Sequence, residues 1–297
     1  MHSGKLDTPR ADTPWKALAA VNIAAIIFGT TGLFGKLDVS PVWITAGRGG
    51  FAALTLLVLG ILWRASFRIH RSFWTRLVAT GILLALHWLT FFISVQMAGV
   101  AVATLTFATF PLFTVVIDAF ARRRMPGLIE IGEGLAIVIA VALLVGTGLP
   151  DTITAQEGAI IGLGSAVSFA LFSIGSQRLG VKVNAVALSF YQYVVVVLFL
   201  LCALPFADRA PSGAGWAIIA VLGTLATAFI HQLYFYGLRH LPASVCGGFV
   251  ALEPVYAIVF AALLFNEPIG FGVVFSGALI IGASLLLLRR SRTPAAL

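Results

Sequence analysis

Charge is the feature that this chain of 297 residues has least of. Lys, Arg, Asp and Glu together make up 10% of the sequence, whereas soluble domains carry about 25%. Hydrophobic residues reach 60%. The low charge excludes an ordinary water-soluble enzyme, and the high hydrophobic content excludes a disordered chain. We therefore expect the chain to place its surface in a lipid bilayer.

Cysteine is scarce as well. Cys202 and Cys246 both fall inside apolar runs, which excludes a disulfide framework and a zinc site. No metal and no cofactor are expected. The net charge of +8 would suit a nucleic-acid partner, but the basic residues stand at the ends of apolar segments instead of among aromatic residues on one stretch. Nucleic-acid binding is therefore excluded, and a protein oriented in a membrane is indicated.

Long apolar runs are what the sequence does contain. A helix needs about 20 apolar residues to cross the ~30 Å hydrocarbon core of a bilayer. We predict an all-α polytopic membrane protein with ten transmembrane helices, at residues 15–36, 41–63, 77–97, 100–121, 128–149, 157–178, 183–204, 215–237, 243–265 and 269–288. The first run exceeds the apolar length of a signal peptide and no small-residue cleavage site follows it, so it is expected to stay as a helix.

The distribution of Lys and Arg predicts the orientation of these helices. Of the 19 such residues, Lys36 and Arg209 fall in one set of connections, Arg48 lies inside a span, and all the others lie in the alternate connections and the termini. Basic connections stay in the cytoplasm. Both termini are therefore predicted to be cytoplasmic, in a bacterial inner membrane, and a monomer is favoured.

The chain also carries an internal repeat. A shift of 143 residues places Phe91 on Tyr234, Pro111 on Pro254 and Gly134 on Gly277. Two halves of five helices result, at 15–149 and 157–288. Because five is odd, the halves cross the membrane in opposite directions, the inverted-repeat plan of many secondary transporters. We expect a central cavity between them.

Several motifs resemble a known family. They are the run RGGF that starts at Arg48, LEPV at 252–255, NEP at 266–268 and GALIIG at 277–282. Together with the two five-helix halves they resemble the drug/metabolite transporter superfamily and, within it, the EamA family. The aromatic content is similar to that of the YddG-like aromatic amino acid exporters. The resemblance implies ten helices, a cavity lined by both halves, and efflux of small metabolites, commonly amino acids. Arg124 stands where the family usually has an acidic residue.

Histidines and aromatic residues in mid-span are the first candidates for a substrate cavity. A polar side chain in hydrocarbon is costly and usually faces a cavity or a partner. His87, Trp88 and Phe91 share the third span, and the repeat places Trp88 on His231 and Phe91 on Tyr234. The alternative is that the histidines are hydrogen-bonded packing residues. Phe172 and Tyr191 are further candidates for the cavity wall.

The two equivalent prolines are the second group of candidates. Proline inside a helix frees a backbone carbonyl, so a kink or a local opening is expected at Pro111 and at Pro254. The preceding residues, Phe110 and Glu253, would lie beside the gap. Glu253 is expected either to bind an amino group or carry a proton, or to pair with a buried donor. 

Arg48 lies about 10 Å inside the second span at 1.5 Å rise per residue. Bracing helix ends by donating to carbonyls is the favoured role, and holding a substrate carboxylate is the alternative. The predicted function is export of amino acids with aromatic or large apolar side chains, by alternating access. A multidrug exporter of lipophilic cations is the first alternative. An intramembrane enzyme that modifies lipids is a distant one, because no nucleophile with a base and no metal-ligand cluster occurs.

Overall fold

The computed structural model describes residues 14–121, 123, 125, 127–144, 153–180, 183–241, 249–250 and 252–290. Within these residues all regular structure is helical and no strand occurs, which confirms the all-α prediction. Six helical stretches in the described part are long and apolar enough to span a membrane, and four shorter apolar helices of 10–17 residues accompany them.

The first half of the chain forms six α-helices and two short 3₁₀ segments. They are α1 (Pro14–Thr31), η1 (Gly32–Lys36), α2 (Pro41–Leu62), η2 (Arg71–Phe73), α3 (Trp74–Ala98), α4 (Val100–Phe107), α5 (Phe110–Ala121) and α6 (Leu128–Leu143). The expected fourth span is thus two helices, because the turn at 108–109 separates α4 from α5.

The second half follows a similar order. Its elements are α7 (Ile153–Gly180), α8 (Ala185–Leu201), η4 (Leu204–Phe206), α9 (Gly213–Gly223), the π-helical η5 (Thr224–Phe229), α10 (Ile230–His240), α12 (Glu253–Phe265) and α13 (Phe271–Arg290). The start of the expected ninth span, 243–265, lies largely outside the described residues. Cys202 is a free, exposed thiol at the end of α8.

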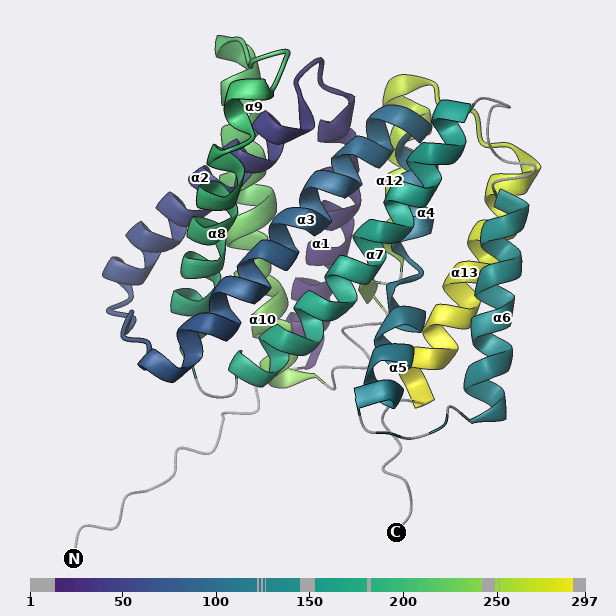
Figure 1. Cartoon of the computed structure of the whole chain (residues 1–297), viewed down its shortest axis with the longest axis horizontal. Helices are drawn as coiled ribbons and strands as arrows, with labels where there is room; N and C mark the ends of the chain where they lie inside the picture. Colours follow the sequence, from purple (N-terminus) through teal and green to yellow (C-terminus); the bar gives the residue numbers. More distant parts are fainter. Residues whose placement is uncertain are drawn as a thin grey trace, which may run out of the picture.

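The helices pack side by side in one tilted bundle (Figure 1). α3 packs along α7 and α1 along α10; α3 also contacts α8, and α2 contacts α9. Three further pairs join the two halves of the chain, namely α2 with α8, α4 with α12, and α6 with α13. Nearly every helix of one half therefore contacts a helix of the other half.

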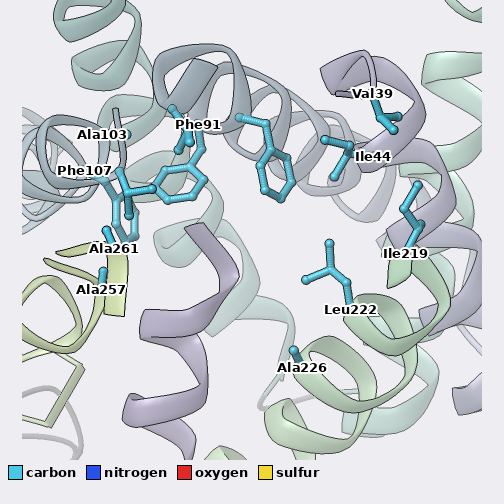
Figure 2. Close-up of a cluster of buried hydrophobic side chains, with 13 residues drawn as sticks. Val39, Ile44, Phe91, Ala103, Phe107, Ile219, Leu222, Ala226, Ala257 and Ala261 are labelled. Atoms are coloured by element: carbon cyan, nitrogen blue, oxygen red, sulfur yellow. The ribbon is translucent and has the colours of Figure 1, made fainter. Parts of the chain in front are cut away.

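The apolar core continues across both halves. Figure 2 shows one buried cluster in which Phe91 and Phe107 of the first half lie near Ala257 and Ala261 of α12, while Ile44 lies near Ile219 and Leu222 of α9. A side chain packed this way is shielded from lipid as well as from water. The halves thus share a core and are not separate units.

Close backbone approach at two glycines helps to hold the halves together. A Cβ atom on Gly29 of α1 would lie 2.7 Å from Cβ of Tyr256 and 3.0 Å from the carbonyl oxygen of Glu253 in α12. A Cβ atom on Gly223 would lie 2.7 Å from the carbonyl oxygen of Arg48 in α2. Small residues at helix contacts permit this approach inside membranes. Both contacts lie beside residues of the candidate site.

A charged contact closes one end of the bundle, which we call the Glu267 end. Lys36 Nζ lies 2.5 Å from Glu267 Oε1. The Glu267 carboxylate also accepts hydrogen bonds from the backbone N–H of Val100 (3.2 Å) and of Ala101 (3.5 Å), at the start of α4. A carboxylate is stabilised at a helix N-terminus by the helix dipole. Gly99 permits the contact, because its φ of 88° favours glycine and an added Cβ would lie 3.2 Å from Glu267 Oε1.

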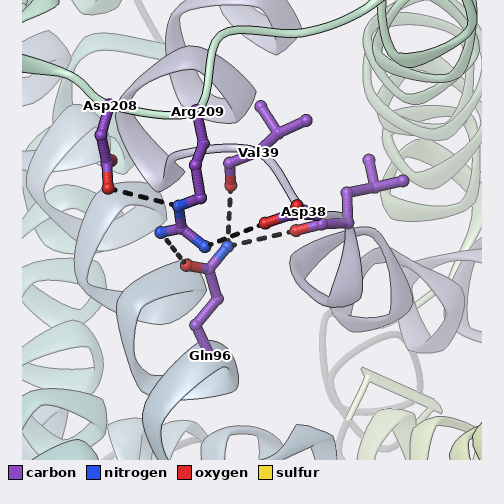
Figure 3. Close-up of polar contacts among 6 residues, drawn as sticks. Asp38, Val39, Gln96, Asp208 and Arg209 are labelled. Atoms are coloured by element: carbon purple, nitrogen blue, oxygen red, sulfur yellow. Dashed lines mark hydrogen bonds and ion pairs between the residues drawn. The ribbon is translucent and has the colours of Figure 1, made fainter.

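A second polar contact lies at the same end. Figure 3 shows the guanidinium of Arg209, which precedes α9, against the Gln96 side-chain oxygen (3.1 Å), Asp38 (3.5 Å) and Asp208 (3.3 Å). The Gln96 amide donates to the carbonyl of Val39 at 2.8 Å. Exposed pairs of this kind contribute little each. Like the Lys36–Glu267 pair, however, the contacts of Arg209 with Gln96 and Asp38 join the first half of the chain to the second.

Candidate functional site

Two prolines mark matching places in the bundle. Pro111 is the second residue of α5, which begins at Phe110 after the turn that follows α4. Pro254 is the second residue of α12, which begins at Glu253. Proline is well accommodated in a first helical turn, where its missing N–H leaves no gap in the helix that follows. The residues before both prolines therefore sit at helix starts in the interior of the bundle.

The prolines also leave polar backbone in the interior. Because proline has no N–H, the carbonyls of Phe107 and Val250, four residues earlier, have no helical partner at positions 111 and 254. Both residues line one small pocket between α4, α5 and α12. Its wall consists of Phe107, Ala108, Phe110, Pro111, Val250, Glu253 and Pro254. The cavity volume of the pocket is about 10 Å³, far below the range of about 300–1,000 Å³ typical of ligand sites.

Aromatic rings extend this pocket toward α3 and α7. We call the aromatic cluster the group His87, Phe91, Phe107, Phe110, Phe169 and Phe172. The His87 ring centroid lies 4.8 Å from that of Phe169 and 4.9 Å from that of Phe107, and Phe110 lies 5.0 Å from Phe169. Tilted and edge-to-face ring pairs at these distances are favourable beyond the area they bury. The cluster offers an apolar surface to one side of the pocket.

His87 is held by the helix opposite. Its Nδ1 lies 2.8 Å from the hydroxyl oxygen of Ser165 in α7, and this hydroxyl donates to the backbone carbonyl of His87 at 3.0 Å. Since a serine hydroxyl has one proton, Nδ1 is the donor of the first bond, and the ring is anchored through Nδ1. This contact agrees with the alternative that His87 is a hydrogen-bonded packing residue, and it also fixes the orientation of a ring in the aromatic cluster.

A second group, the polar centre, consists of Arg48, Trp88, Tyr193, Thr227 and His231. Arg48 is the eighth residue of α2 and is only 4% exposed. Its Nε donates to the Thr227 hydroxyl at 2.8 Å, and its Cζ lies 4.0 Å from the centroid of the Trp88 ring. A guanidinium over an indole face is a favourable cation–π contact. A full positive charge is therefore held in the interior, with one face on an aromatic ring.

Tyr193 connects the other members of the polar centre. Its ring lies 5.5 Å from that of Trp88 and 6.2 Å from that of His231. The Nδ1 of His231 donates to the backbone carbonyl of Thr227 at 2.5 Å. On the far side, Phe28 of α1 lies 5.2 Å from the His231 ring and 6.1 Å from Tyr234. The expected aromatic and histidine residues of the eighth span thus face α1 and α8.

Glu253 and Arg48 bring opposite charges into the same interior. Glu253 is 8% exposed and lines the pocket, and its carboxyl interacts electrostatically with the Arg48 guanidinium. The ion pairs recorded among the described residues do not include one between them. Buried charges are costly unless they are paired. An interior cation and an interior carboxyl group that are near each other without touching form a dipolar arrangement.

The structure corrects two expectations. Tyr191 does not face the interior site: its hydroxyl donates to the carbonyl of Phe67 at 3.2 Å and its ring lies 5.0 Å from that of Trp74, at the α2–α3 connection. The buried face of α8 carries Tyr193 instead. For Arg48, a hydrogen bond to a helix-end carbonyl was expected, whereas its side-chain hydrogen bond within the described residues goes to the Thr227 hydroxyl in mid-bundle.

Several site residues were missed from the sequence. They are Phe107, Ser165, Phe169, Tyr193 and Thr227. A signal for Tyr193 was present, because buried residues of α8 recur three and four apart at Val186, Ser189, Tyr193, Val196 and Leu200, the spacing of one helix face. No sequence signal distinguished Thr227 from the other threonines of the spans.

Comparisons with known proteins agree with this architecture. Residues 15–146 and 156–289 each match the model of the EamA-like transporter family. The chain is 24% identical over 294 residues to the uncharacterized transporter YetK of Bacillus subtilis (strain 168), covering 94% of this chain and 88% of the relative. It is 25% identical over 296 residues to the uncharacterized inner membrane transporter YicL of Salmonella typhimurium (strain LT2), covering 93% and 98%.

A protein of known crystal structure shares the fold. The TM-score is 0.64 at 20% sequence identity, over 93% of this chain and 99% of that chain. The family match covers most of the sequence in two consecutive blocks. Both relatives are described as transporters, and the alignments cover most of their length. The chain belongs to the EamA-like transporter family of the drug/metabolite transporter superfamily, and it is a multi-pass membrane transporter.

Proposed function

We propose that this transporter exports amino acids with aromatic or large apolar side chains across a bacterial inner membrane. The observation that carries the proposal is the dipolar interior, in which Arg48 and Glu253 are both buried and, among the described residues, no ion pair joins them. A zwitterion supplies the two missing partners at once. Its carboxylate binds the guanidinium, in the geometry that arginine favours, and its ammonium group binds the carboxylate of Glu253.

The remaining part of the substrate lies against aromatic rings. Phe107 and Phe110 border the same pocket as Glu253, and the aromatic cluster continues from them to His87. An apolar side chain gains by leaving water for such a surface, and an aromatic one gains further from ring contacts. Small polar amino acids gain neither contribution. The apolar side of the site therefore selects the side chain of the substrate, and the charged side recognises its ammonium and carboxylate groups.

The transport cycle follows from two inverted halves, at residues 15–149 and 157–288, with five helices each. The helix contacts support this arrangement. Exchanging the halves maps the α3–α7 pair onto α1–α10, and the α3–α8 pair onto α2–α9, while α2–α8, α4–α12 and α6–α13 map onto themselves. Rocking of one half against the other would open the interior site to alternate faces of the membrane.

The orientation follows from the basic connections. In the sequence, nearly all Lys and Arg residues outside the spans lie in the termini and in alternate connections. Of these regions, the structure describes the start of α1, the α2–α3 connection, the end of α7 and the end of α13, and these lie at one end of the bundle (Figure 1). We place that end in the cytoplasm by the positive-inside rule, so the Glu267 end faces outward. The pocket is too small for a large amino acid in this arrangement, and the Lys36–Glu267 pair and the Arg209 contacts link the halves at the outer end. Opening outward therefore requires these contacts to part.

Weakening the outer contact is expected to expose the pocket. In a chain with Cys202→Ser and Cys246→Ser, a Phe110→Cys probe should react several-fold faster with a membrane-impermeant maleimide from the outer face when Glu267→Gln is added. The glutamine lacks the charge that pairs with Lys36 and that the α4 N-terminus favours. The matched control is Glu157→Gln, an exposed acidic residue near the start of α7. Equal labelling rates in the two variants would contradict the outer gate.

The proposed function is tested by counterflow in proteoliposomes loaded with unlabelled compound. L-Phenylalanine, L-tryptophan and L-leucine are expected to drive uptake of labelled L-phenylalanine. Phenethylamine and L-phenylalaninamide lack the carboxylate, and 3-phenylpropionate lacks the ammonium group. Each of the three should drive uptake of labelled L-phenylalanine at least about tenfold less, because each leaves one buried charge without a partner. Export that treats all of these compounds alike would overturn zwitterion recognition.

A lipophilic cation is the second candidate substrate. The observation in its favour is the carboxyl group of Glu253 in a pocket bordered by phenylalanine rings, which attracts cations by charge and by cation–π contacts. The buried Arg48 opposes it, since two positive charges would share one interior. Tetraphenylphosphonium should therefore compete weakly with L-phenylalanine in the same assay. Strong competition, together with weak amino acid counterflow, would favour the cation exporter.

A further inference from the structure

The eighth span departs from regular α-helix beside the polar centre. Between α9 and α10 the chain forms the π-helical segment Thr224–Phe229, and the Thr227 hydroxyl donates to the carbonyl of Leu222, five residues earlier, at 2.8 Å. π-Helical turns are rare and frequently occur at functional sites. The extra residue in the turn rotates the side chains that follow relative to those of α9. The backbone around Thr227 therefore differs from that of an ordinary spanning helix.

The back-bond of Thr227 spans five residues, at least one more than the other threonine back-bonds seen in the described spans. The hydroxyls of Thr55, Thr90 and Thr114 donate to carbonyls four residues earlier, the usual back-bond of a threonine in a membrane helix. The Thr227 hydroxyl uses its proton on Leu222 and accepts from Arg48 Nε at 2.8 Å. Its side chain is fully buried, with 0% exposure. This hydroxyl therefore joins the π-helical backbone to the interior cation.

The same residue holds His231. The Thr227 carbonyl accepts from Nδ1 of His231 at 2.5 Å, and the His231 ring lies beside Tyr193, the neighbour of Trp88 in the polar centre. One residue of the second half thus fixes a histidine of its own span and an arginine of the first half. If Thr227 moves, both side chains lose a hydrogen bond.

We infer that Thr227 is a positioning residue for substrate carboxylate recognition, and this inference rests on the proposed function. Its bond fixes Nε of Arg48 and seats the guanidinium over Trp88, which leaves the two terminal NH₂ groups of Arg48 for the substrate. Without the bond, the guanidinium has to be ordered each time a substrate binds. Thr227 touches no substrate atom itself and acts through Arg48.

The test compares Thr227→Val, which keeps the shape and removes the hydroxyl, with Thr227→Ser, which keeps the hydroxyl. In reconstituted full-length protein, Thr227→Val is expected to raise KM for L-phenylalanine about tenfold and to change the maximal rate less than twofold. The inhibition constant of L-phenylalaninamide, which has no carboxylate, should stay the same. Thr227→Ser should return KM to within about threefold of the wild-type value.

The matched control is Thr55→Val, which removes a back-bonded hydroxyl from α2 itself, two turns beyond Arg48. It should leave both constants unchanged. If Thr227→Val yields no folded protein, Thr227→Cys serves in its place, because a thiol is a weak acceptor of similar size. Equal weakening of L-phenylalanine and its amide, or an unchanged KM, would overturn the positioning role while zwitterion recognition stands. A wild-type protein that does not distinguish L-phenylalanine from its amide would overturn the proposed function and this inference together.

Discussion

Replacing Arg48 with methionine is expected to lower kcat/KM for L-phenylalanine export by about ten- to hundredfold. Hydrogen bonds to charged groups contribute about 1.5–3 kcal/mol, and each 1.36 kcal/mol changes a rate constant tenfold. Methionine fills part of the space against Trp88 and offers no donor to a carboxylate. Arg48→Lys keeps the charge but not the paired donors, so its activity should lie between those of the wild type and Arg48→Met. Initial rates from proteoliposomes loaded with L-phenylalanine provide the measurement.

The controls for this variant separate recognition from folding. Arg76→Met removes an exposed arginine near the start of α3 and should leave the rate unchanged. Phenethylamine provides an internal reading, because export of a compound without a carboxylate should fall much less than that of L-phenylalanine in Arg48→Met. A melting temperature near that of the wild type confirms the fold. Full activity of Arg48→Met in a folded protein would remove the guanidinium from the site.

The second large effect is expected at Glu253. Glu253→Gln should reduce kcat/KM for L-phenylalanine at least tenfold, because an amide cannot provide the negative charge that an ammonium group requires in a desolvated site. The same change should raise the melting temperature. A buried carboxylate without an ion pair is costly, and a neutral side chain of the same shape avoids that cost. Gain of stability with loss of activity is typical of a functional residue.

Two measurements check the Glu253 prediction. The melting temperature should rise for Glu253→Gln and stay unchanged for Glu157→Gln, whose side chain is exposed. Counterflow should fall for Glu253→Gln alone. A lower melting temperature together with normal export would mean that Glu253 serves as a structural partner inside the bundle, and the ammonium group of the substrate would have to be bound elsewhere.

The sequence determined the class of protein and the outline of its fold. Low charge, long apolar runs and the proline-marked repeat were sufficient for an all-helical membrane transporter, because hydrocarbon tolerates only closed hydrogen bonding along the backbone. The same rule explains why Pro111 and Pro254 stood out: each removes one backbone donor where no water replaces it. Arg48 and Glu253 stood out because charges are costly in hydrocarbon. A proline or a charge in the middle of an apolar span is energetically unfavourable, and such residues can be recognised in a single sequence.

Only the tertiary structure decided which residues meet. Tyr191 and Tyr193 have equal hydrophobic value, and packing of α8 against α2 and α3 placed Tyr193 inside and Tyr191 at a connection. Thr227 reads like any other threonine until a π-helical turn brings its hydroxyl to Arg48, 179 positions away in the sequence. Lys36 and Glu267 meet across the halves in the same way. The rotation of each helix and the pairing of distant residues depend on how all the helices pack together. No local sequence pattern predicts that packing.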